Sequence, residues 1–268
     1  MGTYRTAQLA RIAGVHPNTV RLYEKLGFIP VAQRQLNGYR VFTELHLRQM
    51  LLARTALQIE LLQRGLRKKI VCAVRLSAAG CYDEALVLAQ GYLDGIEAER
   101  RNAEEAVRIA QGILARPSEA ARAPLRRAKA AQELGLTVET LRSWERNGLV
   151  SSMRGEGGCR VYAPQELRTL KVIRALRCAG YSLEAILRML QQLSSDPGAS
   201  MRDALDTPRE DDDIVTVCDR LISSLEQAQR NACTVVGMLR GLRADYGSTG
   251  ALSHEPASSA RKGEGLPA

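Results

Sequence analysis

The sequence predicts a mainly α-helical protein with two winged helix-turn-helix domains, each followed by a long helix. Three observations predict this class. The stretch VRLYEKLGF at 20–28 returns as LRSWERNGL at 141–149. In both copies a helix, a glycine turn and a second helix are followed by a hairpin signal, which is the pattern of a winged helix-turn-helix. Later in each copy, apolar residues recur at heptad spacing.

The first copy begins with the pattern of a helix-turn-helix. Thr6–Ala13 reads as a short amphipathic helix, and Gly14 begins the tight turn after it. Pro17 fits the first position of the next helix, because its missing N–H would have no partner there. Gly27 is expected to end that helix in a left-handed conformation.

The second copy repeats these signals and adds an N-cap. Thr137 fits the position before the second helix, where a hydroxyl satisfies a free backbone N–H, and Gly148 fits its end. After the second helix, Asn37-Gly38 lies between VAQRQL and YRVF and is a strong hairpin signal. Gly157-Gly158 takes the same place in the second copy. A hairpin after a helix-turn-helix predicts a wing.

The repetition extends well beyond the opening motif. TAQLARIAGVHPNTVRLYEKLGFI aligns without a gap with RAKAAQELGLTVETLRSWERNGLV, and NGYRVF aligns with GGCRVY after the loss of one residue. Further matches pair Leu47-Arg48 with Leu167-Arg168, and Glu97 and Asn102 with Glu226 and Asn231. Four blocks in the same order indicate two copies of one unit.

Each copy ends in a long helix with a heptad pattern. In the first copy the a positions hold Leu86, Leu93, Val107 and Leu114, and the d positions hold Ala89, Ile96, Ala103 and Ala110. In the second copy the a positions hold Val215, Ile222 and Val236, and the d positions hold Cys218, Leu225, Ala232 and Leu239. Arg100 and Gln229 interrupt the two patterns at equivalent a positions. The pattern favours a coiled coil over the alternative that each helix packs on its own domain.

These features divide the chain in sequence order. The predicted parts are a winged domain at 1–80, a long helix at 81–114, a linker at 115–124, a second winged domain at 125–195, a connection at 196–212, a second long helix at 213–244 and a disordered tail at 245–268.

Positive charge lies where the motifs lie. The chain has a formal net charge of +9, and residues 5–69 hold 12 Lys and Arg against 3 Asp and Glu, while residues 116–190 hold 14 against 7. Both segments between and after them are net negative. A polyanion such as DNA favours this distribution, because binding releases its counterions. The alternative is a solvated basic surface.

Several classes of protein find no support in the sequence. No apolar stretch reaches the length of a membrane helix, and no signal-peptide pattern is present, so we expect a cytoplasmic, nucleoid-associated protein that binds no membrane. Phosphate-binding loops and catalytic motifs are missing, so we expect no enzyme. The six cysteines form no C-x-x-C pair and the three histidines show no ligand spacing, so we expect free thiols and no cofactor.

The quoted motifs resemble those of the MerR family of bacterial transcription regulators. LARIAGVHPNTVRLYEKLGFI, NGYRVF and the long helix carry this resemblance, and the second copy repeats it to about Asp245. Members are usually single units that dimerise through an antiparallel pair of long helices. The resemblance therefore implies an intramolecular antiparallel coiled coil and a single-chain pseudo-dimer. It also implies double-stranded promoter DNA and RNA polymerase holoenzyme as partners, at a promoter whose spacer the protein bends and untwists.

The resemblance also indicates which residues contact DNA. Residues near the start of each second helix face the base edges, residues at the aromatic position lie against the DNA backbone, and residues of the wing contact phosphates. For Tyr23 and Trp144, core packing is the alternative. The predicted DNA-binding residues are Asn18, Thr19, Arg21, Tyr23, Tyr39 and Arg40 in the first copy, and Thr137, Glu139, Thr140, Arg142, Trp144 and Arg160 in the second. Cys159 replaces the wing tyrosine of the first copy.

The resemblance leaves the effector open. Cys81 precedes the first long helix as the first ligand cysteine of the mercury sensors does, but no paired cysteines follow that helix. A structural role for the cysteines is therefore favoured, and Cys81 is only a weak candidate for a metal ligand. We expect a response to an unknown small-molecule effector. The alternative function is an architectural DNA-bending factor like the winged excisionases, which lack such long helices.

Overall fold

A computed structural model describes residues 2–58, 65–116, 123–207 and 220–247. The chain divides into two compact units, which are 1–55 with 71–89 and 234–268, and 56–70 with 90–233. The two long helices, α5 (Tyr82–Ala115) and α11 (Leu221–Tyr246), both pass through this division. Each unit therefore combines one module with parts of both long helices.

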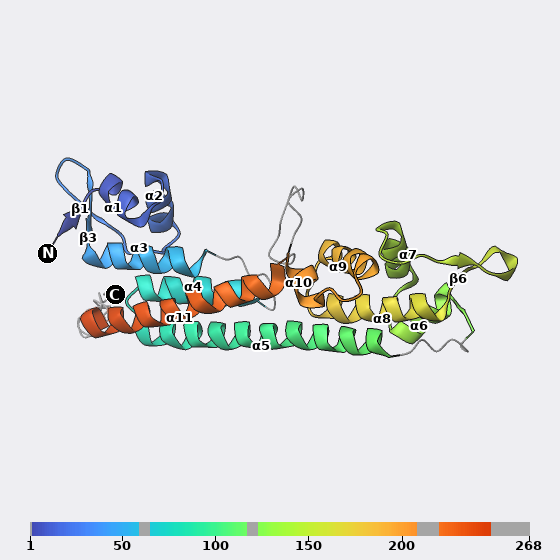
Figure 1. Cartoon of the computed structure of the whole chain (residues 1–268). Helices are drawn as coiled ribbons and strands as arrows, with labels where there is room; N and C mark the ends of the chain where they lie inside the picture. The colour runs from blue at the N-terminus through green and yellow to red at the C-terminus, as the bar shows by residue number, and fades with distance from the viewer. Residues whose placement is uncertain (1, 59–64, 117–122, 208–219, 248–268) are drawn as a thin grey trace, which may run out of the picture. The chain divides into compact units, whose positions relative to one another are not determined.

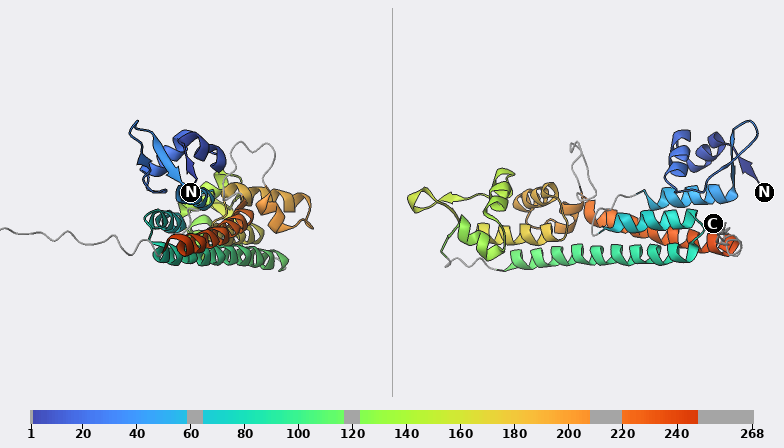
Figure 2. Two further views of the ribbon diagram at one scale, coloured as in Figure 1. Left: turned by 90° about the vertical axis from the view of Figure 1, so that its left-hand side faces the viewer. Right: turned by 180° about the vertical axis from the view of Figure 1, so that it is seen from behind.

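The first unit contains what we call the first module, which runs from β1 to α3. Its elements are β1 (Thr3–Tyr4), α1 (Thr6–Ala13), α2 (Pro17–Lys25), β2 (Gln33–Arg34), β3 (Arg40–Thr43) and α3 (Glu44–Ala56). α3 lies between the helix-turn-helix on one side and α4 (Leu66–Ala78) on the other (Figures 1 and 2). The predicted helix over Thr6–Ala13 is confirmed at both ends.

The second module repeats this order within the second unit. Its elements are β4 (Leu125–Arg126), α6 (Arg127–Leu134), α7 (Val138–Arg146), β5 (Met153–Arg154), the short 3-10 helix η2 (Glu156–Gly158), β6 (Arg160–Tyr162) and α8 (Pro164–Cys178). α9 (Leu183–Ser195) and α10 (Met201–Asp206) follow.

The turn inside each helix-turn-helix has the same geometry in both modules. Gly14 has φ 63° and Gly135 has φ 61°, a left-handed conformation that glycine adopts without a Cβ penalty. The next residue in each turn donates a backbone hydrogen bond of 2.9 Å into the first helix, from Val15 to Ala10 and from Leu136 to Ala131. These equivalent bonds confirm the predicted glycine turn in each copy.

A small three-stranded sheet accompanies each helix-turn-helix. The strand order is β1-β3-β2 in the first module and β4-β6-β5 in the second, with all neighbours antiparallel. Both predicted hairpins are present, and equivalent pairs close them: Arg34 faces Arg40, and Arg154 faces Arg160. β1 and β4 are additions that the sequence did not predict.

Each module has its own apolar core. In the first module it comprises Leu9, Ala10, Ala13, Val20, Ile29, Ala32, Phe42, Leu47 and Met50. In the second module the buried residues include Ala130, Ala131, Leu134, Leu141, Trp144, Leu149, Tyr162, Leu167 and Leu170. Burial of these side chains fixes the second helix of each module against the first, because packed interiors tolerate little rearrangement.

A buried amide holds α3 to α4 in the first unit. Gln49 is fully buried, and its amide nitrogen donates to the backbone oxygens of Phe28 at 3.1 Å and Val74 at 3.0 Å. Its amide oxygen accepts from the hydroxyl of Ser77 at 2.7 Å. A fully satisfied buried network of this kind specifies one packing arrangement, because a shift would leave polar groups without partners.

The long helices bury the predicted d positions, and α11 also buries Ile222 and Val236 at its a positions. In α5 only Val107 of the predicted apolar a residues is buried, and Leu86, Leu93 and Leu114 are half-buried. All four predicted d residues of α5 are buried, as are the three predicted d residues of α11 that the structure describes.

Among the described residues, the residue before the a position is buried too, except for the half-buried Ile113, so the buried stripe is broader than a two-helix seam. Val215 and Cys218 lie outside the described residues. No helix in the described ranges combines the length and apolarity of a membrane span.

The predicted connection at 196–212 contains a helix. α10 buries Met201, Ala204 and Leu205, and the guanidinium of Arg188 in α9 donates to the carbonyls of Ala204 and Leu205 at 3.2 and 3.3 Å. This capping of α10 by a buried arginine explains why a polar segment folds here. Residues 208–212, most of the 115–124 linker and the tail from residue 248 lie outside the described residues.

Candidate nucleic-acid interface

In the first module, α2 turns its opening residues outward. His16 caps the helix, and its Nδ1 accepts a hydrogen bond from the backbone N–H of Asn18 at 3.2 Å. Asn18 and Arg21 are exposed, and Thr19 is half-buried. The Arg21 guanidinium also reaches the Asn18 amide oxygen at 3.4 Å. Amide and guanidinium groups on one exposed face are those that read base edges in a major groove.

In the second module, α7 presents a different set of groups. Thr137 is the N-cap as predicted, and its hydroxyl accepts from the backbone N–H of Thr140 at 3.0 Å. The two threonine hydroxyls also contact each other at 2.8 Å, so both take part in the cap. The exposed Glu139 bonds Arg142 at 3.2 Å and Arg146 at 3.1 Å. The α7 face therefore carries a carboxylate where α2 carries an amide.

The aromatic position differs between the modules. Trp144 is 5% exposed and lies in the core of the second module, so the expectation that it lies against the DNA backbone is corrected to the core-packing alternative. Tyr23 is half-buried at the edge of the first core, and its ring meets Phe28 edge-on at 5.4 Å. Burial raises the pKa of Tyr23, so its hydroxyl stays protonated and available as a donor.

The first hairpin has an apolar, exposed tip. Tyr39 is 69% exposed, and Leu36 and Val31 are exposed more fully still. The loop between β2 and β3 is closed by a backbone hydrogen bond from Gln35 to Tyr39 at 2.9 Å. In the second hairpin the equivalent of Tyr39 is the exposed Cys159, so no phenol is offered there.

A glutamate joins α2 to the hairpin in the first module. The Glu24 carboxylate accepts from the Nε of Arg40 at 2.7 Å and from the backbone N–H of Ala32 at 3.1 Å. The Glu24 side chain is 10% exposed and that of Arg40 is 27% exposed. The predicted hairpin arginine of this module is therefore already paired with a carboxylate.

The equivalent glutamate of the second module has a different partner. Glu145 pairs with Arg127 at the start of α6, and both side chains are 17% exposed. Arg160, the hairpin arginine here, is exposed and donates instead to the backbone oxygen of Ser152 at 3.2 Å. A hollow of about 380 Å³ lies beside it, lined by Glu145, Gly148, Val150, Ser151, Ser152 and Arg160.

Glu145 lies among several polar groups, although its Oε1, the Tyr162 hydroxyl and the Nε of Arg127 have no hydrogen-bond partner within the described residues. Burial would raise the pKa of Glu145, but the proximity of the Ser152 and Tyr162 hydroxyls and the charge of Arg127 outweigh it, so the pKa is lowered. Burial and the adjacent Glu145 raise the pKa of Tyr162 to about 12, so its hydroxyl remains a donor. Glu145 is thus held as a carboxylate.

Sequence reasoning did not single out the two glutamates or Arg127. Glu24 and Glu145 stand in the repeated motif between the aromatic and basic positions, so their repetition was a usable signal. Arg127 has no counterpart charge, because Thr6 occupies its place in the first copy. That difference became meaningful only when the structure placed Arg127 beside Glu145.

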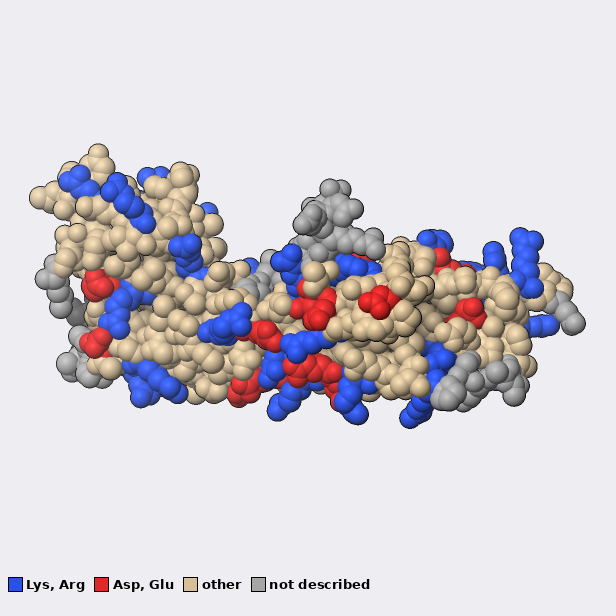
Figure 3. Space-filling view, viewed as in Figure 1, with Lys and Arg blue, Asp and Glu red and all other residues tan. Residues whose placement is uncertain are grey.

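The charged surface agrees with an interface on the helix-turn-helix lobe. On the face shown in Figure 3, the lobe formed by α1, α2 and their hairpin shows Lys and Arg side chains, while Asp and Glu gather along the long helices. Arg21 and Arg11 are among the exposed basic residues of that lobe. Such a lobe attracts an anionic partner.

The cysteines described in the structure are free thiols. Cys72, Cys159, Cys178 and Cys233 are exposed, and Cys81 is partly exposed. Within the described residues, no three His, Cys, Asp or Glu side chains gather as a metal-ligand set. Cys81 accordingly gains no partner ligands from the described part of the fold.

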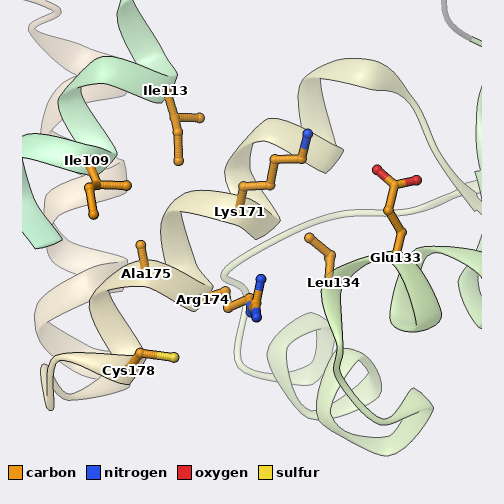
Figure 4. Close-up of a pocket in the computed structure, with 8 residues that line it drawn as sticks. All are labelled: Ile109, Ile113, Glu133, Leu134, Lys171, Arg174, Ala175 and Cys178. Carbon is orange, nitrogen blue, oxygen red and sulfur yellow. The ribbon is translucent and has the colours of Figure 1, made fainter.

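A second hollow lies within the second unit, away from the hairpin. It has a volume of about 300 Å³ and is lined by Ile109 and Ile113 of α5, Glu133 and Leu134 of α6, and Lys171, Arg174, Ala175 and Cys178 of α8 (Figure 4). Apolar side chains thus share one pocket with basic groups. We call it the α5–α6–α8 pocket.

Two helix-turn-helix modules with basic groups on the exposed face of the second helix are the arrangement typical of helix-turn-helix DNA-binding proteins. Comparisons with known families identify the type. The model described as "MerR family regulatory protein" matches residues 5–42, and that described as "MerR HTH family regulatory protein" matches residues 125–193. Each of the two modules therefore contains a segment that matches a model of MerR-family regulators, and the chain carries two such MerR-type units.

Curated relatives match over short segments. The HTH-type transcriptional regulator AdhR of Bacillus subtilis is 38% identical over 61 residues, which are 22% of this chain and 44% of that protein. The HTH-type transcriptional regulator CueR of Escherichia coli is 36% identical over 53 residues, 20% of this chain and 39% of that protein. Nodulation protein NolA of Bradyrhizobium elkanii is 38% identical over 66 residues, 24% of this chain and 30% of that protein.

The chain thus spans less than half the length of these relatives. No solved structure matches it.

Proposed function

We propose that this chain regulates transcription by binding promoter DNA as a single-chain pseudo-dimer. Each module reads one half of an operator with its second helix, α2 or α7. The observation that carries the proposal is the repeated module, with an exposed arginine at the same helical position in each copy, Arg21 or Arg142. Helix-turn-helix dimers with two-fold symmetry bind half-sites about 34 Å apart, which is one turn of DNA. A single chain of this protein has one module for each half-site.

Contacts between the long helices support an antiparallel pair. In the first unit Arg243 of α11 bonds Asp83 of α5 at 2.9 Å, and in the second unit Gln229 of α11 bonds Glu97 of α5 at 3.1 Å. Between these two contacts the residue number rises along α5 by as much as it falls along α11, as expected for two antiparallel helices. Such a register is expected of the dimerisation helices of two paired copies, and it supports their pairing within one chain.

Each module also contacts the long helix of the other copy. Arg48 of the first module bonds Asp245 at 2.5 Å near the end of α11. Its equivalent in the second module, Arg168, donates to the backbone oxygens of Ile113 at 3.1 Å and Leu114 at 2.6 Å at the end of α5. Cations suit helix C-termini, where backbone carbonyls lack partners. Such crossed docking supports a dimer-like arrangement within one polypeptide.

The two modules would read related but unequal half-sites. Asn18 favours adenine edges, whereas the equivalent Glu139 favours a cytosine amino group. Tyr39 and Cys159 differ in the same way on the hairpins. We therefore expect the operator to be an imperfect palindrome.

Regulation at a promoter is favoured over a purely architectural role. Two of the matched relatives are named HTH-type transcriptional regulators. Long paired helices also fit a regulator better than an excisionase-like factor. In this proposal RNA polymerase holoenzyme is the second partner, and binding between the promoter elements alters the DNA so that polymerase engages both.

Selection of binding sites from a random pool of duplex DNA tests the proposal. The intact chain should enrich an imperfect palindrome with half-sites about one helical turn apart. Arg21→Ala should relax selection in one half-site and Arg142→Ala in the other. Enrichment of no sequence, or loss of the same bases in both variants, would contradict it. Footprints at recombination junctions instead of promoters would favour the architectural function.

We also propose that a small amphipathic organic anion is the effector and binds in the α5–α6–α8 pocket. Ile109 is 44% exposed there, so its apolar side chain is open to the apolar part of a ligand. The pocket lining has two cations, Lys171 and Arg174, and one carboxylate, Glu133. Neither Lys171 nor Arg174 forms an ion pair within the described residues. A pocket of about 300 Å³ is at the small end of ligand sites.

This site joins a long helix to the first helix of a reading module, so an occupant would affect the module's position. Fluorescence titration with anilinonaphthalene sulfonate, followed by competition with octanoate or octylamine, tests it. Octanoate should displace the dye and octylamine should not. Lys171→Gln with Arg174→Gln should weaken dye binding about tenfold, the loss of about one charged interaction. Equal dye binding by this variant and the parent chain would contradict the site.

A further inference from the structure

Equivalent glutamates of the two modules have different neighbours. At three positions near the glutamate the first copy has residues without charge, and the second copy has residues whose side chains can donate to a carboxylate. The exchanged positions are Thr6, Ala32 and Phe42 in the first copy, and Arg127, Ser152 and Tyr162 in the second. Arg127 adds a charged donor near one carboxylate and Ser152 and Tyr162 each add a hydroxyl, so the three exchanges act on the same group.

The exchange decides which arginine the glutamate holds. In the first module Arg40 comes from the hairpin and its Nε lies 2.7 Å from Glu24. In the second module Arg127 takes that place from α6, and the hairpin arginine, Arg160, bonds only a backbone oxygen in the described residues. A guanidinium paired with a carboxylate attracts a third charge weakly, because the two charges nearly cancel at a distance.

The surroundings of Arg160 suit an oxyanion. Ser151 and Ser152 line the 380 Å³ hollow beside it together with Glu145, and Ser151 offers a hydroxyl group that is not directed to this carboxylate. At the same positions the first module has Val31 and Ala32, which offer none. Arginine and serine hydroxyls are common donors to DNA phosphate.

We infer that Arg127 is a positioning residue that releases Arg160 to hold a DNA backbone phosphate in this hollow. The second module consequently binds the DNA backbone more strongly than the first module does, because Arg40 of the first module is paired with Glu24. The inference rests on the proposed function, since it assigns unequal tasks to the two reading modules.

Salt dependence of DNA binding tests the inequality directly. Arg160→Gln should weaken binding about tenfold at moderate salt, which corresponds to one charged hydrogen bond. It should also reduce the slope of log affinity against log salt by about 0.9, the value for one phosphate contact. The matched variant Arg40→Gln should produce clearly smaller changes in both. Equal effects of the two variants would overturn the inference.

A rescue experiment separates positioning from folding. Arg127→Thr, which restores the residue of the first copy, should let Glu145 capture Arg160 and should reproduce the lowered salt slope. Adding Glu145→Gln removes the competing carboxylate and should restore most of the slope. A role of Arg127 in stability alone predicts a lower thermal midpoint, a parent-like slope and no rescue. That result would overturn the assignment.

The outcomes also distinguish this inference from the proposed function. If the parent chain binds duplex DNA with a steep salt slope but selects no sequence, the proposed function fails and the difference between Arg160→Gln and Arg40→Gln still decides the inference. If the chain selects its operator and the two variants behave alike, only the inference fails.

Discussion

The two modules repeat one backbone, but they differ in which side chains are buried and which remain exposed. Both turn at a left-handed glycine, and both close a hairpin with equivalent arginine pairs. The first module keeps Tyr23 at its surface edge, whereas the second buries Trp144. Duplication thus preserved the frame, and substitutions at a few positions gave each copy its own surface.

The two modules also differ in the hydrogen bonds that stabilise the helix after the hairpin. In the first, His46 accepts a hydrogen bond from the backbone N–H of Thr43 at 3.1 Å and stabilises the start of α3. Glu166 occupies the equivalent position in the second. Arg168 contacts backbone carbonyls, while Arg48 contacts an exposed carboxylate. The contact of Arg168 is therefore better shielded from water than that of Arg48, whereas the buried His46 has no counterpart in the second module.

The largest expected effect is on stability at the aromatic position. Trp144→Ala should lower the free energy of unfolding of the second unit by about 3 to 5 kcal/mol, as for other buried tryptophans. Tyr23→Phe should change stability little and weaken DNA binding, since only a hydroxyl is lost. Urea unfolding followed by circular dichroism measures the first effect. A small loss of stability for Trp144→Ala would mean that its ring is not a core residue.

The next effect is on DNA affinity. Arg21→Ala combined with Arg142→Ala should weaken operator binding about 100-fold or more, because each arginine contributes roughly 1 to 3 kcal/mol if it contacts a base. Arg101→Ala, an exposed arginine of α5, is the matched control and should bind like the parent. Fluorescence anisotropy with a labelled operator gives the affinities. An unchanged affinity of the double variant would contradict the proposal that α2 and α7 contact the operator.

A smaller effect concerns the crossed docking. Arg168→Gln should destabilise the second unit by about 1 to 2 kcal/mol, because two backbone carbonyls lose charged donors. Arg48→Gln should cost at most about 1 kcal/mol, the value of an exposed ion pair. Trp144 is the single tryptophan, so its fluorescence reports on the second unit alone. Arg48→Gln acts in the first unit and is followed by circular dichroism; a lower urea midpoint for it than for Arg168→Gln would reverse the comparison.

The smallest effect is a pH dependence confined to the first module. Burial lowers the pKa of His46 below its ordinary value of 6.5. Because the folded pKa is depressed, the stabilising effect is present above pH 6.5 and is lost as the pH falls below it. Protonation would break the bond from Thr43, worth about 1 kcal/mol. Thermal midpoints measured across this range should fall in the parent and fall less in His46→Gln. Identical profiles would exclude His46 as the cause.

Repeated local signals predicted much of the frame. Gly14, Pro17 and Thr137 act on backbone geometry within a few residues, so their positions gave the turn, the helix start and the cap correctly. The hairpin signals succeeded for the same reason. The two-residue strands β1 and β4 are too short to show an alternating pattern, and α10 depends on a buried arginine from another helix.

The site was less accessible to sequence reasoning. Exposure of Arg21 and Arg142 agrees with the prediction for the reading helices, although contact with DNA stays a prediction. Burial of Trp144 could not be told from its position, because Tyr23 stands at the same place with a different exposure. The pairing of Glu145 with Arg127 joins residues from two helices, which no local pattern reveals.

The mass of the protein–operator complex tests the central claim most directly. Sedimentation of the chain with a duplex carrying both half-sites should give one chain of 29.4 kDa per duplex, with both half-sites protected from cleavage. Two chains on each operator, or one chain that protects a single half-site, would contradict the account.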